Sequence, residues 1–276
     1  MLIRLGHSPD PDDAFMFWAL AESQIDTRGF EFEHVLRDIQ TLNEWALEGR
    51  LEVTAISLHA YPFVQERYAL LPHGASMGSG YGPVAVAGRA MTRDELRGVE
   101  IAVPGTMTTA FLVLRMYLGE FPYRVVPFDE ILDEVKSGAA EAGLLIHEGQ
   151  LTYKDSGLHL VADMGEWWFG ETGLPLPLGG NVVRTDLGSS LVATISRHLH
   201  ASIAYGLKNR SVALDHSMKY ARSLDRSKAD TFVGMYVNDW TLDYGPKGRE
   251  AVRLFLKRGY EAGVIKHQVD VRFAGD

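Results

Sequence analysis

Short apolar runs alternate with segments of helical periodicity along the first 164 residues, and this alternation restricts the possible folds more than any other feature of the chain. Each run is short enough to be a strand, and the intervening segments have the spacing of amphipathic helices. Such alternation is typical of an α/β protein. The expected strands lie at residues 2–7, 30–36, 53–57, 84–88, 100–103, 124–128, 141–146 and 158–164.

The last third of the chain has a different character, because little strand-like sequence follows Asp186. Four segments there have helical periodicity, at residues 187–208, 210–223, 227–236 and 247–262.

Two stretches rich in Gly and Pro, at residues 78–83 and 173–180, bracket a middle segment with the length of a small domain. A chain that leaves one lobe, forms a second and returns has two crossovers, with a ligand cleft between the lobes. We therefore expect a two-lobed fold, with a large lobe of residues 1–90 and 186–276 and a small lobe of residues 91–185.

Charge and composition exclude several classes of partner and site. The net charge is −9 and no block of Lys and Arg is present, so we expect no nucleic-acid partner. The chain has no cysteine, which excludes disulfides, thiolate zinc sites, iron–sulfur clusters and a cysteine nucleophile. No apolar run is long enough to span a bilayer, and the first residues do not resemble a secretion signal. We therefore expect a cytoplasmic protein that binds a small molecule; the oligomeric state is not predicted.

His147 follows an apolar strand-like run at residues 143–146 and precedes a segment that is expected to begin a helix. Histidine titrates nearest to neutrality of all side chains, and the positive end of a helix dipole favours a neutral, proton-accepting ring. His147 is therefore a candidate general base. The alternative is a histidine that caps the helix or packs in the core.

The first expected strand leads into a loop with the sequence SPDPDD, which begins at Ser8. Open α/β sheets bind ligands at the carboxyl ends of their strands, so Ser8 is a candidate binding residue. The alternative is a structural loop in which Asp12 or Asp13 caps the following helix. A calcium loop is not favoured, because its glycine and distal glutamate are absent.

Residues 103–110 (VPGTMTTA) are expected to form a strand, a turn and a helix start, with three threonines at the turn. Exposed backbone N–H groups and hydroxyls at this position suit a carboxylate or a phosphate. The alternative is an N-cap at Thr106 with Thr108 and Thr109 facing solvent. A Walker loop is excluded, because no Gly-Lys-Ser/Thr follows.

Ser57 lies at the end of another expected strand and is either a binding residue or a helix cap. No Gly-x-Ser-x-Gly surrounds it, so we do not expect an acyl-enzyme. Trp167 and Trp168 are expected to pack in the core or between lobes, with one of them a possible wall of the cleft. Five histidines without metal-site spacing are expected in the core or on the surface: His7, His59, His73, His198 and His200.

Seven strings of this chain, taken together and in order from residue 6 to about residue 186, resemble the 1,4-dihydroxy-6-naphthoate synthases, enzymes of menaquinone formation by the futalosine pathway. They are GHSPDPDDAFMF at residues 6–17, TLNEWALEGRL at 41–51, IS at 56–57, GYGP at 80–83, VPGTMTTA at 103–110, IHEGQLTY at 146–153 and GLPLPLG at 173–179.

The resemblance implies a fold like that of the periplasmic binding proteins, with two α/β lobes. It implies a lyase-type reaction, without a cofactor, that converts cyclic dehypoxanthinyl futalosine to 1,4-dihydroxy-6-naphthoate and releases the sugar-derived fragment. By motif, His147 corresponds to the general base. Ser57, Thr108 and Thr109 correspond to groups that bind the substrate, and the two threonines are expected to hold its carboxylate.

One departure from the family is Asp10, where some members have cysteine, and it places a charge near the expected cleft. Two alternatives stay open: a chorismate dehydratase of the same pathway, or a protein that binds a small carboxylate without chemistry. The sequence does not decide whether Glu148 assists His147 or only complements a helix dipole.

Overall fold

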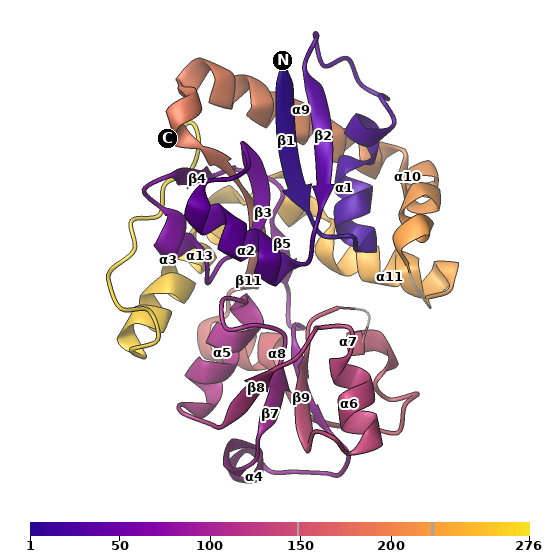
Figure 1. Cartoon of the computed structure of the whole chain (residues 1–276), viewed down its shortest axis with the longest axis vertical. Helices are drawn as coiled ribbons and strands as arrows, with labels where there is room; N and C mark the ends of the chain where they lie inside the picture. The colour runs from indigo at the N-terminus through magenta and orange to yellow at the C-terminus, as the bar shows by residue number, and fades with distance from the viewer. Residues whose placement is uncertain (148, 222–223) are drawn as a thin grey trace.

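The computed structural model describes residues 1–147, 149–221 and 224–276, and they form two β-sheets, each flanked by helices (Figure 1). One sheet and its helices form the upper body in this view, and the other sheet and its helices form the lower body. The expected α/β class is confirmed. Among the described residues, no helix is long and apolar enough to cross a membrane.

The first sheet, sheet A, has the strand order β2-β1-β3-β11-β4, and β5 also pairs with β11. Strands β1, β2 and β3 are parallel, whereas β11 runs antiparallel to β3, β4 and β5. The carboxyl ends of β1 and β3 therefore meet at one edge. The strands are β1 (Leu2–His7), β2 (Glu31–Leu36), β3 (Val53–Ser57), β4 (Tyr68–Leu70), β5 (Ser76–Gly78) and β11 (Leu176–Arg184).

The second sheet, sheet B, has the order β10-β6-β9-β7-β8. Strands β7, β8 and β9 are parallel, and β6 is antiparallel to β9 and β10. The carboxyl ends of β7 and β9 therefore also share an edge. The strands are β6 (Val84–Ala87), β7 (Ile101–Val103), β8 (Tyr123–Val125), β9 (Ala142–Leu145) and β10 (His159–Asp163).

The helices cover both sheets and dominate the chain after sheet A is complete, as expected. They are α1 (Pro11–Ala21), α2 (Ile39–Glu48), α3 (Tyr61–Val64), α4 (Arg93–Gly98), α5 (Thr109–Leu118), α6 (Ile131–Ser137), α7 (Gly149–Thr152), α8 (Met164–Thr172), α9 (Ser189–Lys208), α10 (Arg210–Ser217), α11 (Arg226–Tyr236), α12 (Asp239–Leu242) and α13 (Gly245–Glu261).

Helix α1 is the most deeply buried helix of the upper body. It is apolar on nearly all sides, which is the pattern of a helix enclosed by other elements, and it packs on α9, α10 and α11. Phe15, Met16 and Phe17 are all buried in the core that results. The hydroxyl of Ser202 on α9 donates to the Met16 carbonyl at 2.8 Å. This packing fixes the loop that precedes α1.

A second apolar core runs through both bodies and joins them. Helix α5 of the lower body packs on α13 of the upper body. The absence of a side chain at Gly259 permits this approach, because a Cβ there would lie 3.2 Å from Leu112 Cδ1 and 2.8 Å from Ile265 Cδ1. The two bodies are therefore in direct apolar contact beside the cleft described below.

Strand β11 was not expected, because the sequence pattern predicted only a Gly/Pro-rich interruption at residues 173–180. Pro177 and Gly179 lie in β11, and the register with β5 shifts between them. Proline is tolerated in sheets at such irregularities. Beyond the shift, β11 continues through Val182 and Val183, which are both fully buried. Pairing with β3 and β4 thus outweighs the weak strand propensity of the segment.

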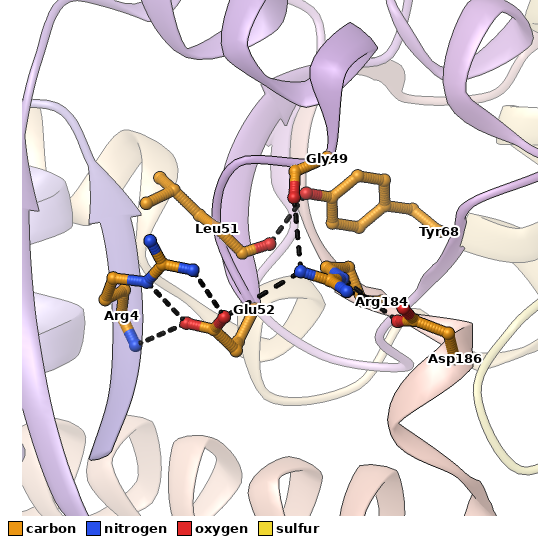
Figure 2. Close-up of polar contacts among 7 residues, drawn as sticks. All are labelled: Arg4, Gly49, Leu51, Glu52, Tyr68, Arg184 and Asp186. Carbon is orange, nitrogen blue, oxygen red and sulfur yellow. Dashed lines mark hydrogen bonds and ion pairs between the residues drawn. The ribbon is translucent and has the colours of Figure 1, made fainter.

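A network around Glu52 ties the strands of sheet A together at the edge opposite the carboxyl ends of β1 and β3 (Figure 2). Arg4 on β1 donates its Nε to Glu52 Oε2 at 2.9 Å, and Arg184 on β11 lies 3.9 Å from Glu52 Oε1. Burial alone would raise the pKa of Glu52, but the hydrogen bonds and charge of Arg4 outweigh this effect and lower it. Glu52 therefore holds β1 and β11 on either side of β3.

The lobe boundaries stay a prediction. Strand β6 begins at Val84 and belongs to sheet B, whereas β11 ends at Arg184 and belongs to sheet A. We therefore propose that the crossovers lie at residues 79–83 and 173–175, about ten residues before the expected boundaries at 90 and 185.

Candidate functional site

A cleft of about 890 Å³, part of it open to solvent, lies where the carboxyl ends of β1 and β3 face those of β7 and β9. All five predicted site residues line it: Ser8, Ser57, Thr108, Thr109 and His147. The other lining residues used below are Asp10, Asp12, Asp13, Ala110, Phe128, Leu178, Asn181, Phe232 and Tyr236.

His147 lies between β9 and α7 with its side chain buried against Phe128. The two rings meet edge to face with their centroids 4.5 Å apart. His147 Nε2 lies 3.1 Å from the Phe128 carbonyl oxygen, which only accepts, so Nε2 carries the proton of the neutral ring. Nδ1 then carries the lone pair, and the Gly149 N–H donates to it over a long 3.4 Å. The ring thus has a fixed tautomer with one basic nitrogen.

The expected helix after His147 is α7, which has only four residues. So short a helix supplies little dipole, so the expected electrostatic effect on His147 is weak. Glu148, whose role the sequence left open, lies outside the described residues.

The turn between β7 and α5 is capped by Thr108 and not by Thr106. Thr108 Oγ1 accepts from the Phe111 N–H at 3.2 Å and donates to the Gly105 carbonyl at 2.8 Å. Thr108 and Thr109 are both buried, so they do not face solvent. The alternative of a Thr106 cap with two exposed threonines is therefore wrong.

Thr109 joins this turn to sheet A. Its hydroxyl donates to the Leu178 carbonyl on β11 at 2.5 Å and accepts from the His59 N–H at 3.3 Å. Both threonine hydroxyl protons are thus directed at backbone carbonyls. The first N–H groups of a helix have no intrahelical acceptor, which makes the N–H groups of Thr109 and Ala110 the candidates in this turn for binding an anion.

Ser57 is held at the end of β3 by Asn43, a fully buried residue of α2. The Asn43 side chain accepts from the Ser57 N–H at 2.8 Å, and its Nδ2 donates to Ser57 Oγ at 3.1 Å. Since Oγ accepts that bond, the Ser57 hydroxyl proton can be directed at a ligand. Asn43 was not predicted, although it lies in the family-like string at residues 41–51.

Ser8 and Asp13 form a second polar pair, at the end of β1, the strand next to β3. Asp13 Oδ2 accepts from the Ser8 N–H at 2.7 Å and from Ser8 Oγ at 2.9 Å. The N-cap of α1 is Asp10, whose side chain makes no capping bond. The expectation that Asp12 or Asp13 caps the helix is therefore wrong, since Asp13 holds Ser8 instead.

The carboxyl groups of Asp10, Asp12 and Asp13 come close together in this loop, and the pKa values of Asp12 and Asp13 are raised. Burial raises the pKa of Asp13 to about 6, although the two bonds from Ser8 favour its charged form. Burial and the nearby charges of Asp13 and Asp10 raise the pKa of Asp12 well above its usual value. A protonated carboxyl in the cleft can donate as well as accept. Asp10, the departure from the family, does line this part of the cleft.

Asn181 contributes a buried acceptor from β11. Its Nδ2 donates to the Gly74 carbonyl at 3.2 Å, so its Oδ1 faces away from that bond. This oxygen is buried and has no hydrogen-bond partner in the described part of the chain. A buried acceptor without a donor costs free energy. A ligand hydroxyl that donates to this oxygen would remove that cost. Asn181 was missed because its strand was missed.

Several other candidates lie away from the cleft. Trp168 is fully buried, packs on Phe255 with ring centroids 5.3 Å apart, and donates its indole N–H to the Pro175 carbonyl at 3.1 Å. Neither Trp167 nor Trp168 lines the cleft, so their role is packing. The five histidines without metal-site spacing are buried or, for His200, exposed, as expected. The described residues contain no group of three or more His, Asp or Glu that could hold a metal.

Comparison with known proteins identifies relatives over nearly the whole chain. A family model described as menaquinone biosynthesis matches residues 3–261. The 1,4-dihydroxy-6-naphthoate synthase of Thermus thermophilus is 43% identical over 256 residues, which cover 92% of this chain and 93% of that protein. The enzyme of the same name from Streptomyces coelicolor is 35% identical over 271 residues, covering 95% and 94%.

Solved structures show the same architecture. A protein from Archaeoglobus fulgidus, 44% identical, superposes with a TM-score of 0.90 over 96% of this chain and 97% of that one. The alkanesulfonate-binding protein of Xanthomonas axonopodis, bound to MOPS, has a TM-score of 0.72 at 12% identity, over 98% and 96% of the two chains. At that identity the likeness concerns the fold alone, and it confirms the expected periplasmic-binding-protein-like fold.

Proposed function

This chain belongs to the menaquinone biosynthesis family, and from that membership we propose that it converts cyclic dehypoxanthinyl futalosine to 1,4-dihydroxy-6-naphthoate. The observation that carries the proposal is the placement of His147, a buried histidine with one basic nitrogen, in the same cleft as the N-terminus of α5. Both relatives described above have the name of this synthase and not that of a chorismate dehydratase.

In the proposed reaction, His147 accepts a proton from the bound substrate and the sugar-derived fragment leaves, in a lyase-type step without a cofactor. A well-placed general base typically contributes about 10²–10⁴-fold to the rate. The N–H groups of Thr109 and Ala110 bind the substrate carboxylate, and the Ser57 hydroxyl donates a further hydrogen bond. The cytoplasmic location expected from the sequence stays a prediction.

The decisive test is incubation of the purified protein with cyclic dehypoxanthinyl futalosine, followed by chromatography and mass spectrometry. Formation of 1,4-dihydroxy-6-naphthoate is the expected result. Binding without product would favour a carboxylate-binding protein without chemistry. If the protein neither binds this compound nor forms the product, the proposal is contradicted. Chorismate derivatives would then be tested as substrates.

Replacing Thr108 and Thr109 together with alanine is expected to raise KM at least about tenfold. Loss of the Thr108 cap and of the Thr109 bond to Leu178 loosens the turn that presents the N–H groups, and a hydrogen bond to a charged group is worth about 1.5–3 kcal/mol. Steady-state kinetics measures the change. The matched control replaces both threonines with serine, which keeps both hydroxyls. An unchanged KM in the alanine variant would remove this turn from the binding site.

Asn181→Leu is expected to raise KM roughly two- to tenfold with little change in kcat, because a hydrogen bond worth about 0.5–1.5 kcal/mol to a substrate hydroxyl is lost. Tyr244→Phe is the matched control. It removes a buried hydroxyl that also lacks a partner among the described residues, but Tyr244 does not line the cleft. Equal effects of the two variants on KM would show that Asn181 makes no such contact.

A further inference from the structure

A hydrogen bond across the cleft joins the two bodies close to His147. Tyr236, the last residue of α11 in the upper body, donates its hydroxyl to Oε1 of Gln150 on α7 in the lower body, at 2.7 Å. Both side chains are at least nine-tenths buried. Tyr236 also lines the cleft. The bond therefore lies inside the molecule, where water does not compete with it.

The Tyr236 side of this bond is rigid. Its ring packs edge to face against Phe232, with centroids 5.1 Å apart, and against Tyr81 of the first crossover, with centroids 6.0 Å apart. Its carbonyl accepts from the Thr241 hydroxyl at 2.8 Å. Burial raises the pKa of Tyr236, so its hydroxyl stays protonated and acts as a donor at neutral pH.

The backbone of Gln150 is hydrogen-bonded to His147, the proposed base. The Gln150 N–H donates to the His147 carbonyl at 2.8 Å, which closes the turn that contains the histidine. Helix α7 has four residues, too few to be stable by its own hydrogen bonds. The amide Nε2 of Gln150 has no partner among the described residues, so Tyr236 is the partner that the structure gives this side chain. Tyr236 thus links the other body, through Gln150, to the turn that carries His147.

We propose that Tyr236 is a positioning residue that acts through Gln150 and brings His147 into place only when the cleft is closed. The proposal rests on the proposed function, in which His147 is the base. Separation of the two bodies would break the bond between Tyr236 and Gln150 and release the His147 turn. Closure over the substrate then completes the catalytic arrangement, as lids and domain closures do in other enzymes.

Loss of the Tyr236 hydroxyl could lower activity in two ways: by misplacing the His147 turn, or only by weakening closure of the two bodies. A second contact between the bodies distinguishes these explanations. Lys228, also on α11, forms an exposed ion pair with Asp155 at 3.0 Å, just beyond α7. Exposed pairs of this kind are worth at most about 1 kcal/mol. Lys228→Met removes a contact between the same two segments without touching Gln150 or the His147 turn, so it is the matched control.

The experiment measures kcat and KM for Tyr236→Phe, Gln150→Leu, the double variant, Lys228→Met and His147→Asn, with cyclic dehypoxanthinyl futalosine as substrate. Tyr236→Phe keeps the ring and its packing and removes only the hydroxyl. We expect each single variant of the pair to lower kcat about 10- to 100-fold with KM changed less than about threefold, because a small misplacement of a catalytic group has effects of this size. The double variant should be no worse than either single variant, and Lys228→Met should retain wild-type kcat.

A kcat within about twofold of wild type for Tyr236→Phe and for Gln150→Leu would overturn the inference, as would losses that multiply in the double variant. An equal loss for Lys228→Met would assign the effect to closure alone. His147→Asn separates this failure from that of the proposed function. An active His147→Asn would overturn both, whereas an inactive His147→Asn with fully active pair variants would overturn only the positioning role.

Discussion

His147→Asn is expected to lower kcat by about 10²–10⁴-fold while KM changes only a few-fold, because the variant loses proton transfer in the transition state and little substrate binding. Asparagine is polar and smaller than histidine, so it fits the space against Phe128 without a clash. Its amide nitrogen corresponds in position to Nδ1, so the variant also loses the bond from Nε2 to the Phe128 carbonyl. Steady-state kinetics with product detection by mass spectrometry measures the effect.

His198→Asn is the matched control for this experiment. His198 is also a buried histidine, but it packs against Phe30 and Phe32 beneath sheet A and does not line the cleft. The His198→Asn variant should keep the wild-type kcat. Wild-type turnover by His147→Asn would contradict the base assignment, and a rise in KM alone would make His147 a binding residue.

The α/β class and most elements were predictable from local pattern. The eight expected strands all occur, though several are shorter, such as β8, which ends at Val125 and not at residue 128. Strand β11 and the short strands β4 and β5 were not predicted. Strand β11 pairs with β3, with β4 and with β5. Their stability comes from partners distant in sequence, which periodicity does not report.

The predicted part of the site consists of residues that directly follow strands or begin helices. Ser8, Ser57 and His147 each end or follow a strand, and topology then brings these ends to one cleft. The missed residues have no such signal. Asn43 lies inside a helix, Asn181 lies on the missed strand and Tyr236 ends a distant helix. Only the tertiary arrangement shows that each of them meets a predicted residue or lines the cleft.

Acid is expected to destabilise the fold strongly, because four histidines are kept neutral in the folded state. Burial lowers the pKa of His7, His34, His59 and His73 to about 4 in each case. The same side chains have a pKa of about 6.5 in an unfolded chain. Between pH 6.5 and 4 the unfolded chain therefore binds more protons, and the free energy of unfolding falls as the pH falls.

The size of this effect is clearest for His59, which makes no hydrogen bond to another histidine. The difference between its pKa in the folded state and in the unfolded chain corresponds to about 3 kcal/mol of the free energy of unfolding. This contribution is present above pH 6.5 and is lost as the pH falls toward 4. His7 and His34 are 2.9 Å apart and titrate as a pair, so their contributions do not simply add. Asp13 acts in the opposite direction. Its pKa of about 6 makes the folded state gain protons first, which offsets part of this loss between pH 6 and 4.

Urea unfolding followed by circular dichroism, at several values between pH 7.5 and 4.5, measures this loss. His59→Asn isolates one histidine, because the amide nitrogen of asparagine corresponds in position to Nδ1 and can donate to the Thr108 carbonyl that His59 contacts, but it does not titrate. Over this pH range the free energy of unfolding of the variant should fall by about 2–3 kcal/mol less than that of the wild type. Its free energy of unfolding at pH 7.5 serves as the reference, so a packing defect is separated from the pH effect. If both proteins have the same dependence on pH, His59 does not remain neutral in the folded state, and acid destabilisation must arise from the other buried groups.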